Sequence, residues 1–316
     1  MKKIVIFIEK YSFLLGIALF VIIISTTNIV EIFRHIKNIN PFYLLLAALI
    51  TFPMFLSKSL CWNYIIRKQG IKYDFKNSLL MYWAGVYIGF LTPGKIGEIS
   101  KALYLKKDGH SMGESIIGVI LDRISDFIFL LTFALIGSLF LLGFIQKQVI
   151  ILLLGILIFF VIFIIFWRIG LIKMIFKKML SVLLPPKYQK SWNINIQDFI
   201  SGLKIFKLKN YLIIFIITAF SWLFYYLQMY VLTRGIGMDI SFLYLAVFVT
   251  ITGFITLIPV SISGIGTRDA SLILLLSPLL IPKEQIIVFS ALMLAMLLFA
   301  GLIGLICWLI KPLRIK

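Results

Sequence analysis

The stretch that decides the fold is Leu91-Thr92-Pro93-Gly94-Lys95-Ile96-Gly97-Glu98, a polar segment inside a strongly apolar chain. A helix that begins there would have Thr92 as its N-cap and Pro93 at its first position, which is a favourable start. At membrane depth, the unbonded N–H groups and the positive dipole end of such a helix attract an anion. The rest of the sequence must therefore show whether this stretch lies within a bilayer.

The composition indicates a membrane protein. Hydrophobic residues make up 62% of the chain and charged residues only 14%, whereas soluble proteins average about 45–50% and about 25%. Several runs reach the roughly 20 apolar residues that a helix needs to cross a bilayer. The net charge of +19 fits lysines and arginines gathered in cytoplasmic loops, so no nucleic-acid partner is expected.

Apolar segments alternate with loops of unequal charge. The segments cover about 11–30, 41–60, 78–91, 115–143, 150–167, 211–233, 243–258, 267–277 and 285–310. Basic residues concentrate in 61–77, in 168–210 and in the C-terminal tail, whereas 31–40, 144–149, 234–242 and 278–284 carry little net charge. The run at 11–30 has no small-x-small cleavage site, so we interpret it as an uncleaved first span.

The charge distribution predicts two chain reversals inside the membrane. If 78–91 crossed the bilayer once, the basic loop at 168–210 would lie outside, against the positive-inside rule. If the chain instead turns at 92–98 and returns through about 99–107, every basic segment becomes cytoplasmic. A second hairpin, with its tip at 259–268, then enters from the opposite side.

We therefore predict an all-α polytopic membrane protein with six transmembrane spans and two re-entrant helical hairpins in an inverted-topology repeat. Residues 1–316 form one transmembrane domain, with a half-repeat at 11–143 and an inverted half-repeat at 149–310. The basic segment 168–210 between them is expected to hold amphipathic helices on the anionic cytoplasmic lipid surface. Such repeats are typical of transporters, which bind substrates near the midplane at broken helices.

Ionisable residues within the spans are costly and mark candidate functional positions. The first tip supplies Thr92, Gly94, Lys95, Gly97 and Glu98. The second supplies Ser261, Ser263, Gly264, Gly266, Thr267, Arg268 and Asp269. A third group comprises Asp122, Arg123 and Asp126, early in the segment 115–143, with the two carboxylates on one helix face because they are four residues apart.

Structural roles compete with functional ones at each position. Asp122 and Arg123 could neutralise each other, or Arg123 could pair with Glu98 and fix the hairpin to a span. Lys95 could extend its ammonium group to the cytoplasmic interface, and Arg268 could form a salt bridge with Asp269. The aromatic and amide residues Trp222, Tyr225, Tyr226 and Gln228 fit packing or an interfacial belt.

The motifs resemble those of the lysylphosphatidylglycerol synthase transmembrane-region family, also called flippase-like domain proteins. Residues 89–98 match its P-G-[KR]-x-G-E element, 121–126 its E-R-x-x-D element, and 258–269 its P-x-S-x-x-G-x-G-x-R-E element. Asp122 and Asp269 replace the usual glutamates, which keeps the charge and shortens the reach. In bifunctional members the membrane region moves an aminoacylated phospholipid between leaflets, and a separate soluble domain synthesises it.

The resemblance implies a lipid flippase of a prokaryotic-type plasma membrane with cytoplasmic termini. The chain ends at Lys316, so we expect no aminoacyl-transfer domain. The expected partner is a lipid with an anionic phosphate headgroup, such as an aminoacyl-phospholipid, a polyprenyl-phosphate or a glycolipid.

In this reading Lys95 and Arg268 hold the phosphate, Arg123 shares its charge, and Glu98, Asp122, Asp126 and Asp269 orient the cations or carry a proton. The tip residues Thr92, Gly94, Gly97, Ser263, Gly264, Gly266 and Thr267 complete the binding site. We expect no catalytic residue, metal or cofactor. The alternatives are a membrane transferase that uses Glu98, Asp122 and Asp126 as metal ligands or bases, and a transporter of a soluble anion.

Overall fold

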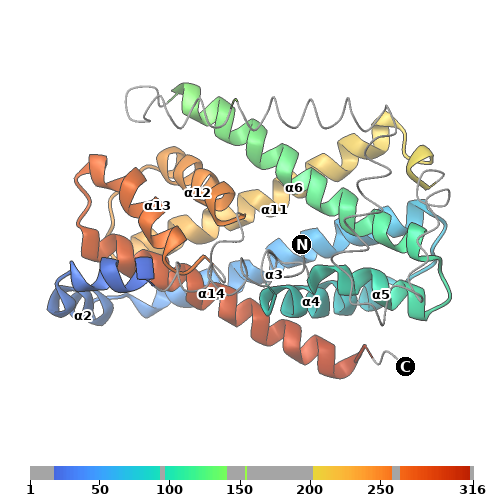
Figure 1. Ribbon diagram of the computed structural model, residues 1–316, viewed down its shortest axis with the longest axis horizontal. Coiled ribbons are helices and arrows are strands. Elements are labelled where there is room, and N and C mark those ends of the chain that lie inside the picture. Colours follow the sequence, from blue (N-terminus) through green and yellow to red (C-terminus); the bar gives the residue numbers. More distant parts are fainter. Residues whose placement is uncertain (1–17, 93–96, 141–153, 155–201, 258–263, 314–316) are drawn as a thin grey trace.

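The computed structural model describes residues 18–92, 97–140, 154, 202–257 and 264–313, and every regular element within them is a helix (Figure 1). After a helical segment at 18–25, the elements are α2 (Ile29–Lys37), α3 (Pro41–Lys68), α4 (Phe75–Phe90), α5 (Ser100–Lys107), α6 (Met112–Phe140), α11 (Leu208–Gly235), α12 (Phe242–Leu257), α13 (Thr267–Leu276), the 3-10 turn η2 (Ser277–Leu279) and α14 (Lys283–Ile310).

Three of these helices, α3, α11 and α14, are long and apolar enough to cross a membrane. Each has 28 residues, which at about 1.5 Å per residue exceeds the roughly 30 Å hydrocarbon core. α6 has 29 residues and carries its charged side chains in its first half. The expected segments at 150–167 and 168–210 lie almost entirely outside the described residues.

Two boundaries differ from the sequence-based expectation. The first apolar segment bends by 89° between residues 18–25 and α2, so that 29–37 form a helix where a loop was expected. Asn28 causes this restart, because its side chain accepts hydrogen bonds from the N–H groups of Val30 and Glu31. At the other boundary α3 continues to Lys68, since Trp62, Ile65 and Ile66 are fully buried and extend its packed face.

The central feature of the fold is an antiparallel pair formed by α3 and α11 (Figure 1). At one end the N–H of Asn40 donates to the carbonyl of Gly235 at 3.1 Å. At the other end Asn210 Nδ2 donates to Tyr64 Oη at 2.8 Å. Between them Gln228 Nε2 donates to the carbonyl of Ala47 at 2.8 Å. Hydrogen bonds therefore join the two helices along their whole length.

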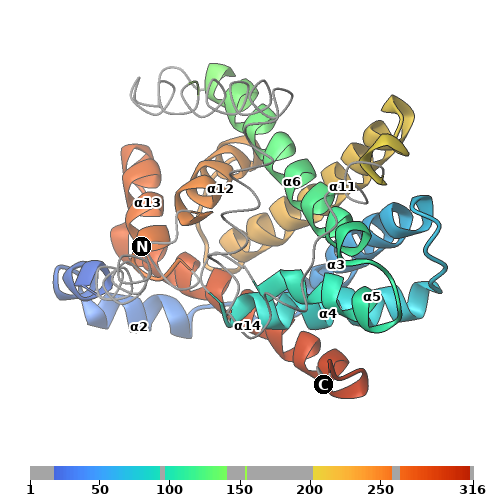
Figure 2. The same ribbon diagram turned by 45° about the vertical axis from the view of Figure 1, so that its right-hand side comes forward.

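The remaining helices pack across this pair. α4 packs on the last helix, α14, and α12 packs on α6. Glycines allow the close approach: a Cβ atom added to Gly304 of α14 would lie 2.6 Å from the carbonyl oxygen of Trp83, and one added to Gly137 of α6 would clash with Val247. In both ribbon views α4–α5 and α12–α13 lie towards opposite sides of the molecule (Figures 1 and 2).

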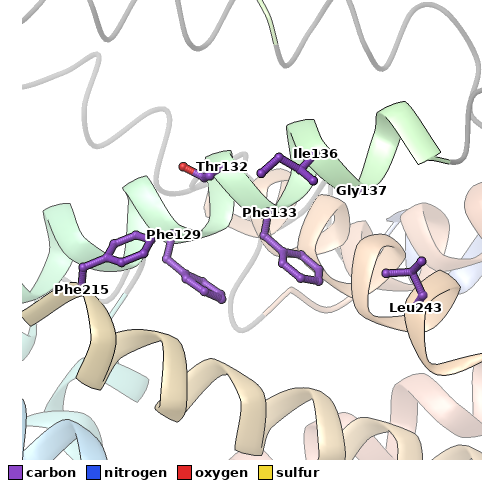
Figure 3. A pocket seen from close by; sticks show the side chains of 7 residues that line it. All are labelled: Phe129, Thr132, Phe133, Ile136, Gly137, Phe215 and Leu243. Carbon is purple, nitrogen blue, oxygen red and sulfur yellow. The ribbon is translucent and has the colours of Figure 1, made fainter. Parts of the chain in front are cut away.

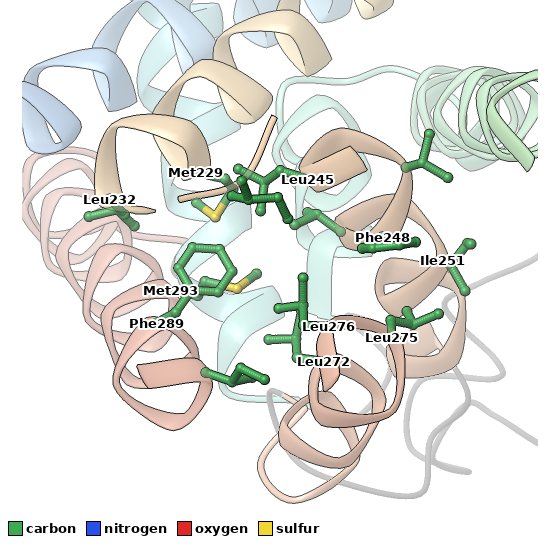
Figure 4. Close-up of a cluster of buried hydrophobic side chains, with 14 of the residues drawn as sticks. Met229, Leu232, Leu245, Phe248, Ile251, Leu272, Leu275, Leu276, Phe289 and Met293 are labelled. Atoms are coloured by element: carbon green, nitrogen blue, oxygen red, sulfur yellow. The ribbon is translucent and has the colours of Figure 1, made fainter. Parts of the chain in front are cut away.

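Two clusters of buried apolar side chains hold these helices together. The larger one joins α11, α12, α13 and α14 and includes the buried side chains of Phe248 and Phe289 (Figure 4). The other surrounds Trp62 and Tyr82 and joins α3, α4, α5 and α6. The polar groups described next lie beside this second cluster.

Candidate functional site

The site begins where the chain reverses between α4 and α5. A Cβ atom on Gly85 would clash with the side chain of Lys101, and one on Gly89 would lie 2.6 Å from Glu98 Cγ. Gly85 therefore lies opposite Lys101, and Gly89, one turn later in α4, lies opposite the earlier residue Glu98. The chain thus returns antiparallel to α4. The two glycines leave the space that the side chains of Glu98 and Lys101 fill.

The side chain of Thr92 connects the C-terminal end of α4 to Gly97, and the helix start expected at Thr92 and Pro93 falls partly outside the described residues. The Thr92 hydroxyl donates towards the carbonyl of Gly89 at 3.0 Å and accepts the N–H of Gly97 at 2.7 Å. After a 3-10 turn at 97–99, α5 begins at Ser100. Pro93, Gly94, Lys95 and Ile96 lie outside the described residues.

Lys101 forms the centre of a buried ion-pair network. Its ammonium group lies 2.8 Å from Glu98 Oε2 and 3.1 Å from Asp122 Oδ2, and the side chain is fully buried. Lys58 of α3 lies 2.9 Å from Asp122 Oδ1 and also pairs with Asp126. The network therefore connects α3, α5 and α6.

Arg123 closes the network on its more exposed side. Its Nη2 atom lies 3.2 Å from Glu98, 3.0 Å from Asp122 and 3.1 Å from Asp126. The Arg123 side chain is 37% exposed, whereas those of its partners are nearly inaccessible. Its Nε atom is buried and has no hydrogen-bond partner among the described residues. Arg123 thus has a donor that none of the described residues uses.

Aromatic side chains surround the charges. Trp222 Nε1 of α11 donates to Asp126 Oδ1 at 2.9 Å. Tyr82 Oη donates to Asp122 Oδ2 at 3.3 Å, and the ammonium group of Lys101 lies 4.2 Å from the Tyr82 ring centroid. Such a cation over an aromatic face gains electrostatic stabilisation, more so where water is excluded.

The network balances its formal charge, with three cations and three carboxylates: Lys58, Lys101, Arg123, Glu98, Asp122 and Asp126. A buried ion pair adds little net stability by itself, but removing one partner typically costs about 3–5 kcal/mol. The six groups are thus interdependent. The pairing of Arg123 with both Glu98 and Asp122 agrees with the two structural locks considered from sequence.

A second chain reversal joins α12 to α13 and carries Arg268. Gly264 and Gly266 have φ angles of 79° and 80°, a region that favours glycine. The carboxylate of Asp269 accepts the N–H of Gly266 at 2.8 Å and so caps α13. Arg268 is buried, and its Nε atom donates to Ser290 Oγ of α14 at 2.7 Å.

The candidate residues thus form two groups. Glu98, Asp122, Arg123 and Asp126 are in direct contact, whereas Arg268 and Asp269 belong to the second reversal, with Gly264, Gly266 and Thr267 beside them. Lys95, Gly94 and Ser263 lie outside the described residues, so their roles stay predictions.

Lys58 and Lys101 are the functional candidates that sequence reasoning missed. Lys58 lies inside the apolar segment 41–60, and that position was the available signal. Lys101 lies in the returning segment 99–107 together with Lys106 and Lys107, and the sequence does not distinguish it from them. The burial of Lys101 depends on Asp122 of α6 and on the space left by Gly85, which the local sequence does not show.

An apolar cavity of about 220 Å³ is lined in part by residues of α6 from Phe129 onward, three positions after Asp126 (Figure 3). Phe129 and Phe133 of α6 point into the space between α6, α11 and α12. Phe129 also stacks on Trp222 at a centroid distance of 6.2 Å. One aromatic layer therefore separates this cavity from Asp126.

The described residues contain no group of three or more His, Cys, Asp or Glu side chains arranged to hold a metal ion. Each carboxylate of the network instead contacts at least one cation. This arrangement suits charge stabilisation and gives no local support for metal ligation by Glu98, Asp122 and Asp126.

Comparison with known proteins agrees with this architecture. Residues 11–309 match the family model described as the lysylphosphatidylglycerol synthase TM region. The chain is also 26% identical over 298 residues to the UPF0104 membrane protein MJ1595 of Methanocaldococcus jannaschii. This alignment covers 90% of this chain and 87% of that protein. With its long apolar helices, it is an integral membrane protein, and it belongs to the lysylphosphatidylglycerol synthase transmembrane-region family.

Proposed function

We propose that the protein is a lipid flippase that moves a phosphate-bearing lipid between the leaflets of the bilayer. The observation that carries this proposal is the charge-balanced network buried among apolar helices, with Arg123 as its more exposed cation. A charged side chain at the centre of a membrane helix costs about 2.5–3.5 kcal/mol on insertion scales. A network of six such groups gives a polar route for a headgroup where the bilayer has none.

The two chain reversals support the re-entrant hairpins in this proposal. α4 and α12 have 16 residues each, or about 24 Å of helix, which is less than the roughly 30 Å core. The chain turns back after α4, as the contacts of Gly85 and Gly89 indicate. A helix that is too short to cross the bilayer and is followed by a chain reversal fits a segment that enters and leaves the membrane on the same side.

The distribution of charge at the helix ends supports the proposed orientation. Short contacts join the helix ends on one side of the molecule: Gln69 Nε2 with the carbonyl of Glu114 at 3.0 Å, and Tyr104 Oη with the carbonyl of Lys311 at 2.6 Å. The described basic residues near these ends are Arg67, Lys68, Lys72, Lys76, Lys106, Lys107, Lys204, Lys207, Lys209 and Lys311. The positive-inside rule makes this side cytoplasmic.

In this mechanism the phosphate of the headgroup is held by Arg268 and Lys95, and Arg123 shares its charge. The acyl chains stay in the hydrocarbon, and the apolar cavity at Phe129 and Phe133 offers space for a chain next to the network. Arginine suits the phosphate because its planar donors match two phosphate oxygens at once.

The test is leaflet-resolved labelling of a fluorescent anionic phospholipid in proteoliposomes. We expect Arg268→Ala and Lys95→Ala to slow transbilayer movement at least tenfold. Arg234→Ala is the matched control, because Arg234 lies exposed at the end of α11 and pairs with Asp239. If both site variants move lipid at the rate of the control, the site assignment is wrong.

The same preparation separates movement from chemistry. A membrane transferase would change the mass of the lipid in the presence of divalent metal, whereas a flippase returns the lipid unaltered. A transporter of a soluble anion would instead take up labelled phosphate without moving lipid.

A further inference from the structure

A groove of about 490 Å³ lies at one end of the central helix pair. Ile217 of α11 lines one side of it, and the other side is lined by residues from the last three turns of α3. These α3 residues are Leu60, Asn63, Tyr64, Arg67 and Lys68. The groove therefore runs between two helices that are each long enough to span the membrane.

The groove lies on the side of α3 that faces away from the ion-pair network. Lys58 contacts Asp122 of α6. With 3.6 residues per turn, Leu60, Tyr64 and Arg67 lie between about 180° and 240° around the helix from Lys58. The groove is thus a second polar feature of α3, which the proposed function does not use.

The groove changes from basic to apolar along α3. Arg67 and Lys68 lie in the last turn of the helix, and Tyr64 lies one turn before them. Leu60 is 45% exposed and lies seven residues before Arg67, or about 10 Å along the helix axis. Basic and tyrosine side chains at a helix end lie at the level of the lipid headgroups, and the apolar end lies in the hydrocarbon. A phospholipid has its phosphate and its acyl chains in the same order.

The basic end of the groove offers hydrogen-bond donors. Lys68 Nζ lies 5.6 Å from the centroid of the Tyr64 ring. The Tyr64 hydroxyl accepts the Nδ2 group of Asn210 at 2.8 Å, so its own proton is available for a ligand. Neither Arg67 nor Lys68 takes part in the ion pairs formed among the described residues. A guanidinium group and an ammonium group together suit a phosphate.

The start of α11 adds positive charge beside the groove. The bond between Asn210 and Tyr64 holds the first turn of α11 against α3. Exposed lysines occupy positions close to Asn210 in the sequence, at Lys204, Lys207 and Lys209. Basic pockets between membrane helices bind anionic lipid headgroups. The apolar end at Leu60 favours a lipid over a soluble anion, which would leave that end unfilled.

We propose that this groove binds one anionic diacyl phospholipid of the leaflet at this end of the helices. Arg67, Lys68 and Tyr64 hold the phosphate, and an acyl chain lies along Leu60 and Ile217. The bound lipid bridges α3 and α11 and so stabilises their antiparallel pairing.

This lipid site is separate from the phosphate site assigned to Lys95 and Arg268, and it does not rest on the proposed flippase function. Binding is measured in detergent, whereas transbilayer movement is measured in proteoliposomes. The failure of one proposal is therefore distinguishable from the failure of the other.

The first test removes the two positive charges. The double variant Arg67→Gln with Lys68→Gln should raise the apparent Kd for dioctanoyl phosphatidylglycerol about tenfold or more. The Kd is obtained from the ligand-dependent rise in Tm of the full chain in detergent. The matched control, Lys72→Gln with Lys107→Gln, removes two exposed lysines that do not line the groove and should stay within about threefold of wild type.

The second test fills the apolar end. Leu60→Trp should raise the Kd severalfold because the larger side chain occupies the place of the acyl chain. Leu212→Trp is the matched control, since Leu212 is exposed on α11 and does not line the groove. Both leucines are exposed, so the Tm of the ligand-free protein should be close to that of wild type in both variants.

Three results would overturn the proposal. The first is wild-type affinity in the double variant of Arg67 and Lys68, and the second is an equal loss of affinity in its lysine control. The third is a rise in Tm with inorganic phosphate or dioctanoyl phosphatidylcholine that equals the rise with dioctanoyl phosphatidylglycerol, because the site would then bind any anion or any lipid. Unchanged affinity in Leu60→Trp refutes the placement of the acyl chain.

Discussion

Removing the central ammonium group of the network is expected to destabilise the protein strongly. In Lys101→Met the network changes from three cations and three carboxylates to two cations and three carboxylates, all close to one another. Glu98 and Asp122 would each lose a contact, at 2.8 and 3.1 Å. Breaking a buried ion pair from one side costs about 3–5 kcal/mol, which corresponds to a fall in Tm on the order of 10 °C.

The double variant Lys101→Met with Glu98→Gln tests the cause of this loss. It restores equal numbers of charges, two of each sign, so it should be at least about 1 kcal/mol more stable than the sum of the two single changes predicts. The control is Lys107→Met in the same helix, where the side chain is exposed and the effect should stay within about 0.5 kcal/mol.

The assay is thermal unfolding in detergent, followed by tryptophan fluorescence, with size-exclusion profiles to show that each variant starts folded. A Tm for Lys101→Met equal to that of Lys107→Met would refute the network as a stabilising unit. Strict additivity of Lys101→Met and Glu98→Gln would refute the charge-balance argument while leaving the contacts themselves intact.

Three further outcomes are expected. Gly85→Ala should lower the free energy of unfolding by about 1–3 kcal/mol, because the added methyl group overpacks the network. Gly253→Ala has open space around its Cβ and should raise the free energy of unfolding by up to about 1 kcal/mol through helix propensity. Thermal unfolding checks both. Trp222→Phe removes the 2.9 Å hydrogen bond to a carboxylate and should cost about 1.5–3 kcal/mol, and a loss under 0.5 kcal/mol by the same method would contradict this role. Cysteines at positions 51 and 228, whose native side chains share a hydrogen bond, should be joined by a short thiol-reactive cross-linker in a background free of other cysteines; no cross-link would contradict the antiparallel pairing of α3 with α11.

The helices and the chain reversals were accessible from the sequence for physical reasons. Apolar runs of about 20 residues have few ways to satisfy their backbone in lipid other than a helix. Glycine and proline at 92–98, together with the charge of the flanking loops, indicated the first reversal. The structure ends α4 at Phe90 and begins α5 at Ser100, each one residue from the expected position.

The site could be predicted only in part from the sequence. Glu98, Asp122, Arg123 and Asp126 stood out because they are charges near apolar runs, and they do form one group. The register between the halves could not be determined from the sequence, because Lys95-Ile96-Gly97-Glu98 can be aligned with Gly264-Ile265-Gly266-Thr267, which pairs Gly97 with Gly266. The contacts of Gly97 and Gly264 instead align these two glycines. A motif of four residues cannot fix such a register, because glycines recur at short spacing in both tips.

The crossed packing of α4 on α14 also constrains how the protein is made. Ribosomes deliver the N-terminal half first, yet the surface of α4 that contacts Gly304 has its partner in the last helix of the chain. Before α14 enters the membrane, this face of α4 lacks its packing partner, and the adjacent network is not yet fully enclosed. Insertion of α14 (Lys283–Ile310) is therefore the step that completes both halves together, and nascent chains that end before residue 283 should be recognised by membrane quality control.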